Sequence, residues 1–250
     1  MLALDSSSAV IYKGYTYSDL SGTSVTLSIS MKVSYTMANY YPLDNANIWQ
    51  FYTSNSSIAQ GYETELVSGS ETVNGVSGKK ICYNVGHAER DCNVYTNDST
   101  GLYIDKFFNK GSGDYIEDVY SPAIYLSPPY VTDSEEFSSV STDTSTVLST
   151  GVSSTSTVTL SGQMKGLESI AVTAGTFNCL KFYYTVSNSY GSYHQITLWF
   201  ANNVGIIKST DDSYTSGRTL IDSKTKTLNY AYINGITYGS YVTETTTKAP

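Results

Sequence analysis

Charged residues are scarce in this sequence, and helical patterning is absent. Only 14% of the 250 residues are charged, well below the roughly one quarter of an ordinary soluble protein. No segment repeats apolar residues at the helical period, whereas Thr, Tyr, Val and Ile, which suit pleated strands, are frequent. We therefore expect an all-β protein with little helix, built from antiparallel strands in a curled sheet, a half-barrel or a sandwich.

Basic residues are also few. The formal net charge is −8, and the 14 lysines and arginines are scattered. Phosphate binding needs clustered basic side chains, so we expect no nucleic-acid partner. No apolar run approaches the roughly 18 residues of a membrane span, so we expect no transmembrane segment in this chain.

The residues that catalysis commonly uses are missing or isolated. The two histidines, His87 and His194, lie in unrelated segments. His87-Ala88-Glu89 matches a deaminase His-x-Glu, but the Pro-Cys-x-x-Cys that must accompany it is absent. No Gly-x-Ser-x-Gly elbow, phosphate-binding glycine loop or Cys-x-x-Cys pair occurs. We therefore expect no enzyme activity, no cofactor and no metal.

Two short acidic groups offer oxygen ligands of the kind that calcium prefers. Neither fits a known calcium loop, so we interpret both as solvated acidic turns. They consist of Asp114, Glu117 and Asp118, and of Asp133, Glu135 and Glu136.

Cysteines and sequons are compatible with export. Cys82 and Cys92 flank a short segment that suits a hairpin and one disulfide. Cys179 falls in an alternating strand and is interpreted as a small buried hydrophobe. Asn55 and Asn97 begin Asn-x-Ser sequons, which are glycosylation candidates if the organism has the machinery.

The segment Ser24–Met37 alternates apolar and polar residues without interruption, which predicts a long strand with one buried face. Long strands with few lysines are poor at blocking edge pairing. We therefore expect this segment, or Ala9–Ser18, to donate a strand to another chain. The candidate assembly residues are Val25, Leu27, Ile29, Met31 and Val33.

The segment Lys165–Thr210 gives the clearest succession of strands and turns. Leu180, Phe182 and Tyr184 recur at every second residue, and Trp199 follows on the next predicted strand. These aromatic side chains either pack a core or line a ligand groove.

Composition divides the chain into three parts. Residues 1–38 form an N-terminal strand segment with the possible donor strands. Residues 39–235 form the main antiparallel domain, with a Ser/Thr-rich loop near 133–161. Residues 236–250 form a Thr-rich tail.

Several short motifs resemble a family of uncharacterised bacterial secreted proteins and lipoproteins with an Ala-Gly-Thr-Phe motif. They lie between Tyr40 and Lys208 and comprise Pro42-Leu43 with Trp49, Gly101-Leu102-Tyr103, Ala174-Gly175-Thr176-Phe177 and Val204-Gly205. The chain departs from the family pattern in having Asn45-Ala46-Asn47 before the Trp and Thr173 before the Ala-Gly-Thr-Phe. The resemblance implies a half-barrel similar to periplasmic lipoprotein carriers, without catalytic residues.

Two functions follow from these observations. The first is an exported, non-catalytic structural protein of the cell surface or matrix, which assembles with itself or other surface proteins by strand pairing, for example as a filament subunit. The alternative is a periplasmic or surface-anchored half-barrel that binds an apolar ligand or a lipoprotein.

Overall fold

The computed structural model describes residues 2–4, 10–18, 27–55, 60–83, 92–110 and 114–243. In this part of the chain, the one helix is a single 3₁₀ turn, η1 (Met37–Asn39), so the predicted all-β class is confirmed.

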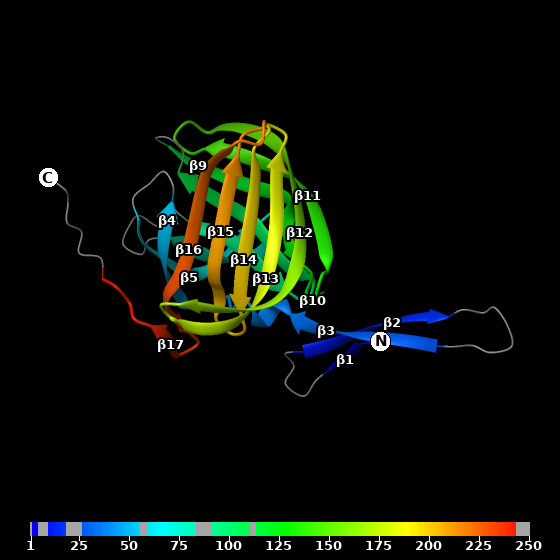
Figure 1. The fold of residues 1–250 in the computed structure, drawn as a ribbon. Helices are drawn as coiled ribbons and strands as arrows, with labels where there is room; N and C mark the ends of the chain where they lie inside the picture. Colours follow the sequence, from blue (N-terminus) through cyan, green and yellow to red (C-terminus); the bar gives the residue numbers. More distant parts are fainter. Residues whose placement is uncertain are drawn as a thin grey trace.

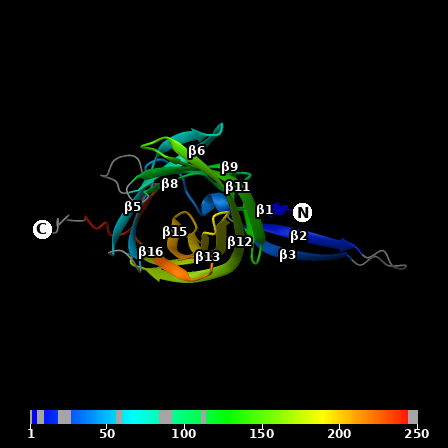
Figure 2. The same ribbon diagram turned by 90° about the horizontal axis from the view of Figure 1, so that it is seen from above.

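Most strands form a closed antiparallel barrel (Figures 1 and 2). Neighbouring strands pair in the order β15-β14-β13-β12-β11-β9-β8-β7-β6-β5-β4-β16, and β15 also pairs with β16, which closes the ring. The predicted curled sheet therefore closes completely. The barrel strands are β4 (Ile48–Asn55), β5 (Gly61–Val73), β6 (Val76–Tyr83), β7 (Cys92–Asp98), β8 (Gly101–Lys110), β9 (Tyr115–Ser127), β11 (Glu136–Val147), β12 (Val152–Val172), β13 (Gly175–Asn188), β14 (Tyr193–Ala201), β15 (Gly205–Tyr214) and β16 (Leu220–Ile233).

A smaller four-stranded sheet holds the N-terminal strands. It has the order β1 (Leu2–Leu4), β2 (Val10–Ser18), β3 (Leu27–Thr36) and β10 (Tyr130–Thr132). The β2–β3 hairpin projects sideways from the base of the barrel as an arm (Figure 1). Val25 lies outside the described residues, and of Leu27, Ile29 and Met31 only the strand is described. Near the barrel, Val33 is 41% exposed whereas Ser34 is fully buried, so the predicted buried apolar face is open at this point.

Two predicted boundaries are wrong. The segment 133–161 is not a loop, because β11 and the start of β12 form a twelve-pair antiparallel hairpin there. Exposed residues of β11 alternate with more buried ones, among them Ser141 and Asp143, and β-branched Thr suits a strand. The predicted tail is also partly ordered, since β17 (Ile236–Gly239) pairs with β16.

The base of the barrel is closed by the segment that follows β3. Met37, Tyr40 and Tyr41 are buried in the same cluster as Trp49 and Phe200. The Trp49 indole donates a hydrogen bond to the Val204 carbonyl at 2.6 Å. The segment that follows β3 thus contributes aromatic side chains to the interior at the base of the barrel.

Candidate functional site at the polar end of the barrel

The interior of the barrel changes character along its axis. At the base, fully buried aromatic and aliphatic side chains from nearly every strand form one cluster. Toward the opposite end, strand alternation points charged and polar side chains inward. We call this second region the polar end, defined by Glu63, Glu65, Tyr83, Asn93, Tyr95, Asp118, Asp143, His194, Asp211, Lys224 and Lys226.

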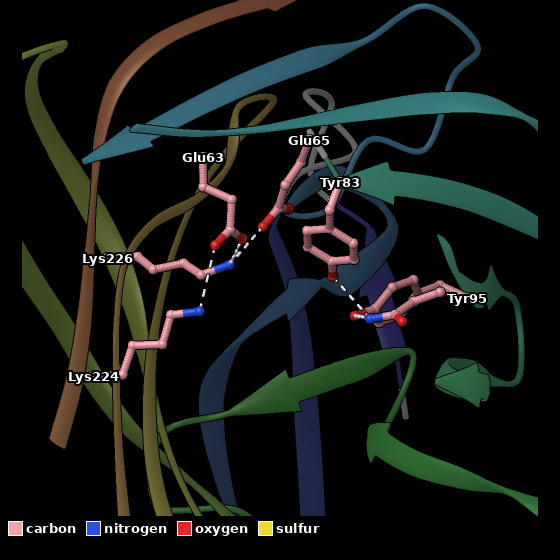
Figure 3. Close-up of polar contacts among 7 residues, drawn as sticks. Glu63, Glu65, Tyr83, Tyr95, Lys224 and Lys226 are labelled. Atoms are coloured by element: carbon pink, nitrogen blue, oxygen red, sulfur yellow. Dashed lines mark hydrogen bonds and ion pairs between the residues drawn. The ribbon is translucent and has the colours of Figure 1, made fainter. Parts of the chain in front are cut away.

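An ion-pair cluster occupies one wall of the polar end (Figure 3). Lys226 on β16 bonds to Glu63 and, at 2.9 Å, to Glu65, both on β5. Lys224 lies 3.4 Å from Glu63. The register explains this, because Phe51 of the intervening strand β4 pairs with both Leu228 and Glu63, so the β5 and β16 side chains project to the same interior face.

Burial perturbs these charges. Burial would raise the pKa of Glu63, but the ammonium groups of Lys226 and Lys224 lower it. For Glu65, which lies deeper, burial outweighs Lys226 and raises the pKa. Burial opposes the charge of Lys226, yet Glu65 and Glu63 raise its pKa. Lys226 is therefore a charged group that the fold holds between two carboxylates.

A neutral network lies beside this cluster. The Asn93 amide donates to the Tyr83 hydroxyl at 2.8 Å and to the Tyr95 hydroxyl at 3.4 Å. Burial raises the pKa of both tyrosines, so both stay neutral hydroxyls. Figure 3 shows Tyr83 and Tyr95 on the side of Glu65 away from Lys226.

On the adjoining strands, His194 of β14 bonds to Asp211 of β15 at 2.9 Å, and Asp211 pairs in register with Lys224 of β16. This hydrogen bond raises the pKa of His194. The Asp211 side chain is 41% exposed, whereas that of Glu65 is only 8% exposed. Solvent therefore reaches the polar end, and access decreases toward the core.

Several polar atoms inside the barrel are buried without a hydrogen-bond partner. They are Thr53 Oγ1, Ser141 Oγ, Asp143 Oδ1 and Tyr184 Oη. Buried polar groups are nearly always satisfied by protein, water or ligand. These atoms mark the part of the interior where the protein alone does not complete the hydrogen bonding.

The predicted aromatic residues are divided between two faces. Phe182 and Tyr184 are 0% and 2% exposed and stack at 6.0 Å in the core. Trp199 instead lies on the outer face, between the Lys181 and Lys208 ammonium groups at 5.2 and 4.9 Å from its ring. Its indole donates to Glu168 at 2.9 Å. The three residues do not form one groove.

An outer depression of about 490 Å³ lies beside Trp199. Its wall includes Leu167, next to an irregularity in the pairing of β12 with β13. The other lining residues are Lys165, Gly166, Glu168, Lys181, Tyr183 and Thr197. This depression is separate from the interior.

The remaining predicted residues are placed as follows. Cys82 and Cys92 are joined in a disulfide between β6 and β7, and Cys179 is a buried free thiol. Asn55 ends β4. The Asn97 side-chain nitrogen, to which a glycan would attach, donates to the Tyr41 carbonyl at 3.0 Å.

The sequence interpretation missed the polar end. Asp118, interpreted as part of a solvated turn, points into the barrel from near the start of β9. The signal was the alternation of Glu63, Glu65 and Val67, and of Lys224, Lys226 and Leu228, which places charges on an apolar face. Within the described residues, no three His, Cys, Asp or Glu side chains are grouped to hold a metal, and no helix there is long and apolar enough to cross a membrane.

Comparison with solved structures gives distant likenesses. A candidate lipoprotein from Parabacteroides distasonis is 13% identical with a TM-score of 0.42, over 77% of this chain and 98% of its own. A candidate exported protein with a YmcC-like fold from Bacteroides fragilis is 9% identical with a TM-score of 0.41, over the same shares. The hypothetical lipoprotein YmcC from Escherichia coli is 10% identical with a TM-score of 0.40, over 77% of this chain and 86% of its own.

The sequence comparisons are more specific. Curated protein sequences give no match. Residues 129–224, which run from β10 into β16, match the model of the DUF3108-like family. The match includes the Ala174-Gly175-Thr176-Phe177 motif on which the predicted resemblance rests. The resemblance to an uncharacterised domain family is therefore confirmed, and the chain carries a DUF3108-like segment over residues 129–224.

Proposed function

We propose that the protein is an exported, non-catalytic binding protein that holds an amphipathic ligand at the polar end of its barrel. The observation that carries this proposal is the solvent-accessible set of inward-facing charges above a sealed aromatic core. Buried ion pairs contribute little to stability compared with apolar packing. Their presence in the interior is better accounted for by recognition of a ligand.

The amphipathic character follows from the residues between the two regions. Val186 and Ile196 are only partly buried and pack against the core. Val186 pairs with His194, and Ile196 pairs with Asp211. A ligand at this level would meet apolar side chains on one side and charges on the other.

Export is supported by the Cys82–Cys92 disulfide, because disulfides persist in oxidising compartments. The absence of catalytic motifs in the sequence supports a binding role over an enzymatic one.

A thermal-shift comparison of three eight-carbon probes, octanoate, octylammonium and octanol, tests the proposal. We expect at least one charged probe to raise the melting temperature of the wild type in a saturable way. The Glu63→Gln/Lys224→Gln variant should lose or weaken this shift. If none of the probes shifts the wild type, the proposed binding function is contradicted; if the variant responds unchanged, the ligand does not contact the wall that carries Glu63 and Lys224.

Strand-mediated assembly is the second candidate function. Its supporting observation is the β2–β3 arm, which projects from the barrel and exposes Val33 at its base. Removal of residues 1–31 should convert an oligomer into a monomer by light scattering, with a mass below the 27.2 kDa of the full chain. A full-length chain that is already monomeric at high concentration would contradict this function.

A further inference from the structure

Two carboxylates face each other across β9 and β11 on the wall of the polar end that has no ion pair. Asp143 pairs in register with Tyr120, and Ser145 pairs with Asp118. The Ser145 hydroxyl bonds to Asp118 and lies 3.3 Å from Asp143 Oδ2. Both carboxylates are thus within reach of one hydroxyl group.

Alternation places this pair inside the barrel. Tyr120, two residues from Asp118, packs against the core cluster, and Ser141, two residues from Asp143, pairs with buried Val158. Asp143 itself is 9% exposed. The pair therefore lies among interior side chains and not in a surface turn.

Hydrogen-bond donors to the pair are too few. A serine hydroxyl has one proton, so Ser145 satisfies one carboxylate at a time. The Ser156 hydroxyl lies 3.4 Å from Asp143 Oδ2. Asp143 Oδ1 is buried without a partner, as is Ser141 Oγ, whose residue is 1% exposed.

The pair also lacks a positively charged partner among the described residues. None of the ion pairs in the described part of the chain involves Asp118 or Asp143. Burial and Asp118 raise the pKa of Asp143, and burial raises that of Asp118. A cation between them would relieve both the burial cost and the mutual repulsion.

The chemistry of the cation follows from the acceptors present. A calcium ion takes six to eight oxygen ligands, and no group of three metal-ligating side chains exists among the described residues. An alkylammonium group has three N–H donors. The interior offers acceptors in matching number from Asp118, Asp143 and the unpartnered Ser141 hydroxyl.

We propose that Asp118 and Asp143 form the subsite that receives the ammonium group of the ligand. This inference rests on the proposed function and specifies the ligand class as an organic cation with an apolar body. The Lys226 cluster on the opposite wall already balances its own charges and therefore positions the ligand without binding its cation.

Isothermal titration of octylammonium and of octanoate into the full chain tests the subsite. We expect saturable binding of octylammonium, at least tenfold tighter than that of octanoate. Asp118→Asn and Asp143→Asn should each weaken octylammonium at least tenfold and leave octanoate unchanged. The matched control is Glu117→Gln, which removes the same charge next to Asp118 from a residue that bonds to Lys106 instead, and should leave octylammonium binding unchanged.

The outcomes separate the two proposals. If octanoate binds more tightly and its binding depends on Lys224 and Glu63, the binding function stands and the ammonium subsite is overturned. If octylammonium binds equally to the wild type and both aspartate variants, the subsite is likewise overturned. If neither probe binds, the proposed function fails together with the subsite. Circular dichroism of each variant shows that a loss of binding is not a loss of fold.

Discussion

The two halves of the barrel interior are built from the same strands but from opposite kinds of side chain. At the base, Phe182 contacts Tyr184, Phe200 and Phe137 in stacked and edge-on arrangements. At the polar end, Lys226 and its two glutamates occupy equivalent inward positions. The same backbone therefore supports a region built by apolar burial and a region built by charge pairing.

This difference between the two regions indicates which one maintains the fold and which one is available for binding. Burying an aromatic side chain contributes roughly 2 to 3 kcal/mol. Burying a charge costs several kcal/mol, and the attraction of an oppositely charged partner does no more than offset this cost. We therefore expect substitutions at the base to unfold the protein, and neutral substitutions at the polar end to change binding more than stability.

The largest expected effect is at the base. Phe182→Ala should lower the free energy of unfolding by about 3 to 5 kcal/mol, because it leaves a cavity among aromatic rings. Tyr232→Ala, at a 40% exposed position, should cost less than about 1 kcal/mol. Urea unfolding of both variants measures the difference. A small cost for Phe182→Ala would mean that this side chain lines a groove.

Removal of one charge at the polar end should have the next largest effect. Lys226→Met should cost about 3 kcal/mol, because Glu63 and Glu65 then remain buried without their closest cation. The double variant Lys226→Met/Glu65→Gln should recover most of this loss. Lys224→Met, at a more exposed position, should cost less than about 1 kcal/mol. Equal costs for both lysines would contradict the gradient of burial.

Asp143→Asn should stabilise the protein by roughly 1 kcal/mol at neutral pH, since it removes an unpaired buried charge. The folded pKa of Asp143 is raised above its ordinary value of 3.8, so the folded state binds the proton more tightly. The stability of the wild type relative to this variant should therefore fall as pH rises from below 3.8 through the folded pKa. Thermal unfolding across this range checks the sign, and an opposite slope would place a cation beside Asp143.

The smallest effect concerns His194. Its pKa is raised above 6.5 by the bond to Asp211, so the folded state binds the proton more tightly than the unfolded chain. The stabilisation that protonated His194 contributes is complete below pH 6.5 and is lost as pH rises through the folded pKa. His194→Asn should lack this pH-dependent change in stability, which melting curves between pH 5 and 8 would reveal. A step of the same size in the variant would assign it to another group.

Strand alternation in the sequence was sufficient to predict the all-β class, but it left open whether Phe182 and Tyr184, which are buried in the structure, pack a core or line a groove. It was not sufficient for closure, because the pairing of β15 with β16 depends on the curvature of the whole sheet and not on a local motif. The hairpin of β11 and β12 was missed because Ser and Thr occur in both loops and strands.

The candidate site was harder to predict than the fold. Glu63 and Lys226 are 163 residues apart, and only the register across β4 brings them together. Likewise Asp118 and Asp143 become neighbours only when β9 pairs with β11. Local sequence reports which residues share a face of one strand, whereas the site is made by residues that share a wall of the barrel.

The closure of the barrel also determines when the chain is able to fold. β4 (Ile48–Asn55) pairs with β5 on one side and with β16 (Leu220–Ile233) on the other, so the first barrel strand gains its second partner only after β16 is available. Contacts this distant in sequence form slowly. Until they form, the sheet keeps two open edges that pair readily with other chains. The barrel of a nascent chain therefore stays open, and its edges stay able to pair with other chains, until the last strands emerge. This order favours delivery of the chain to its final compartment before folding.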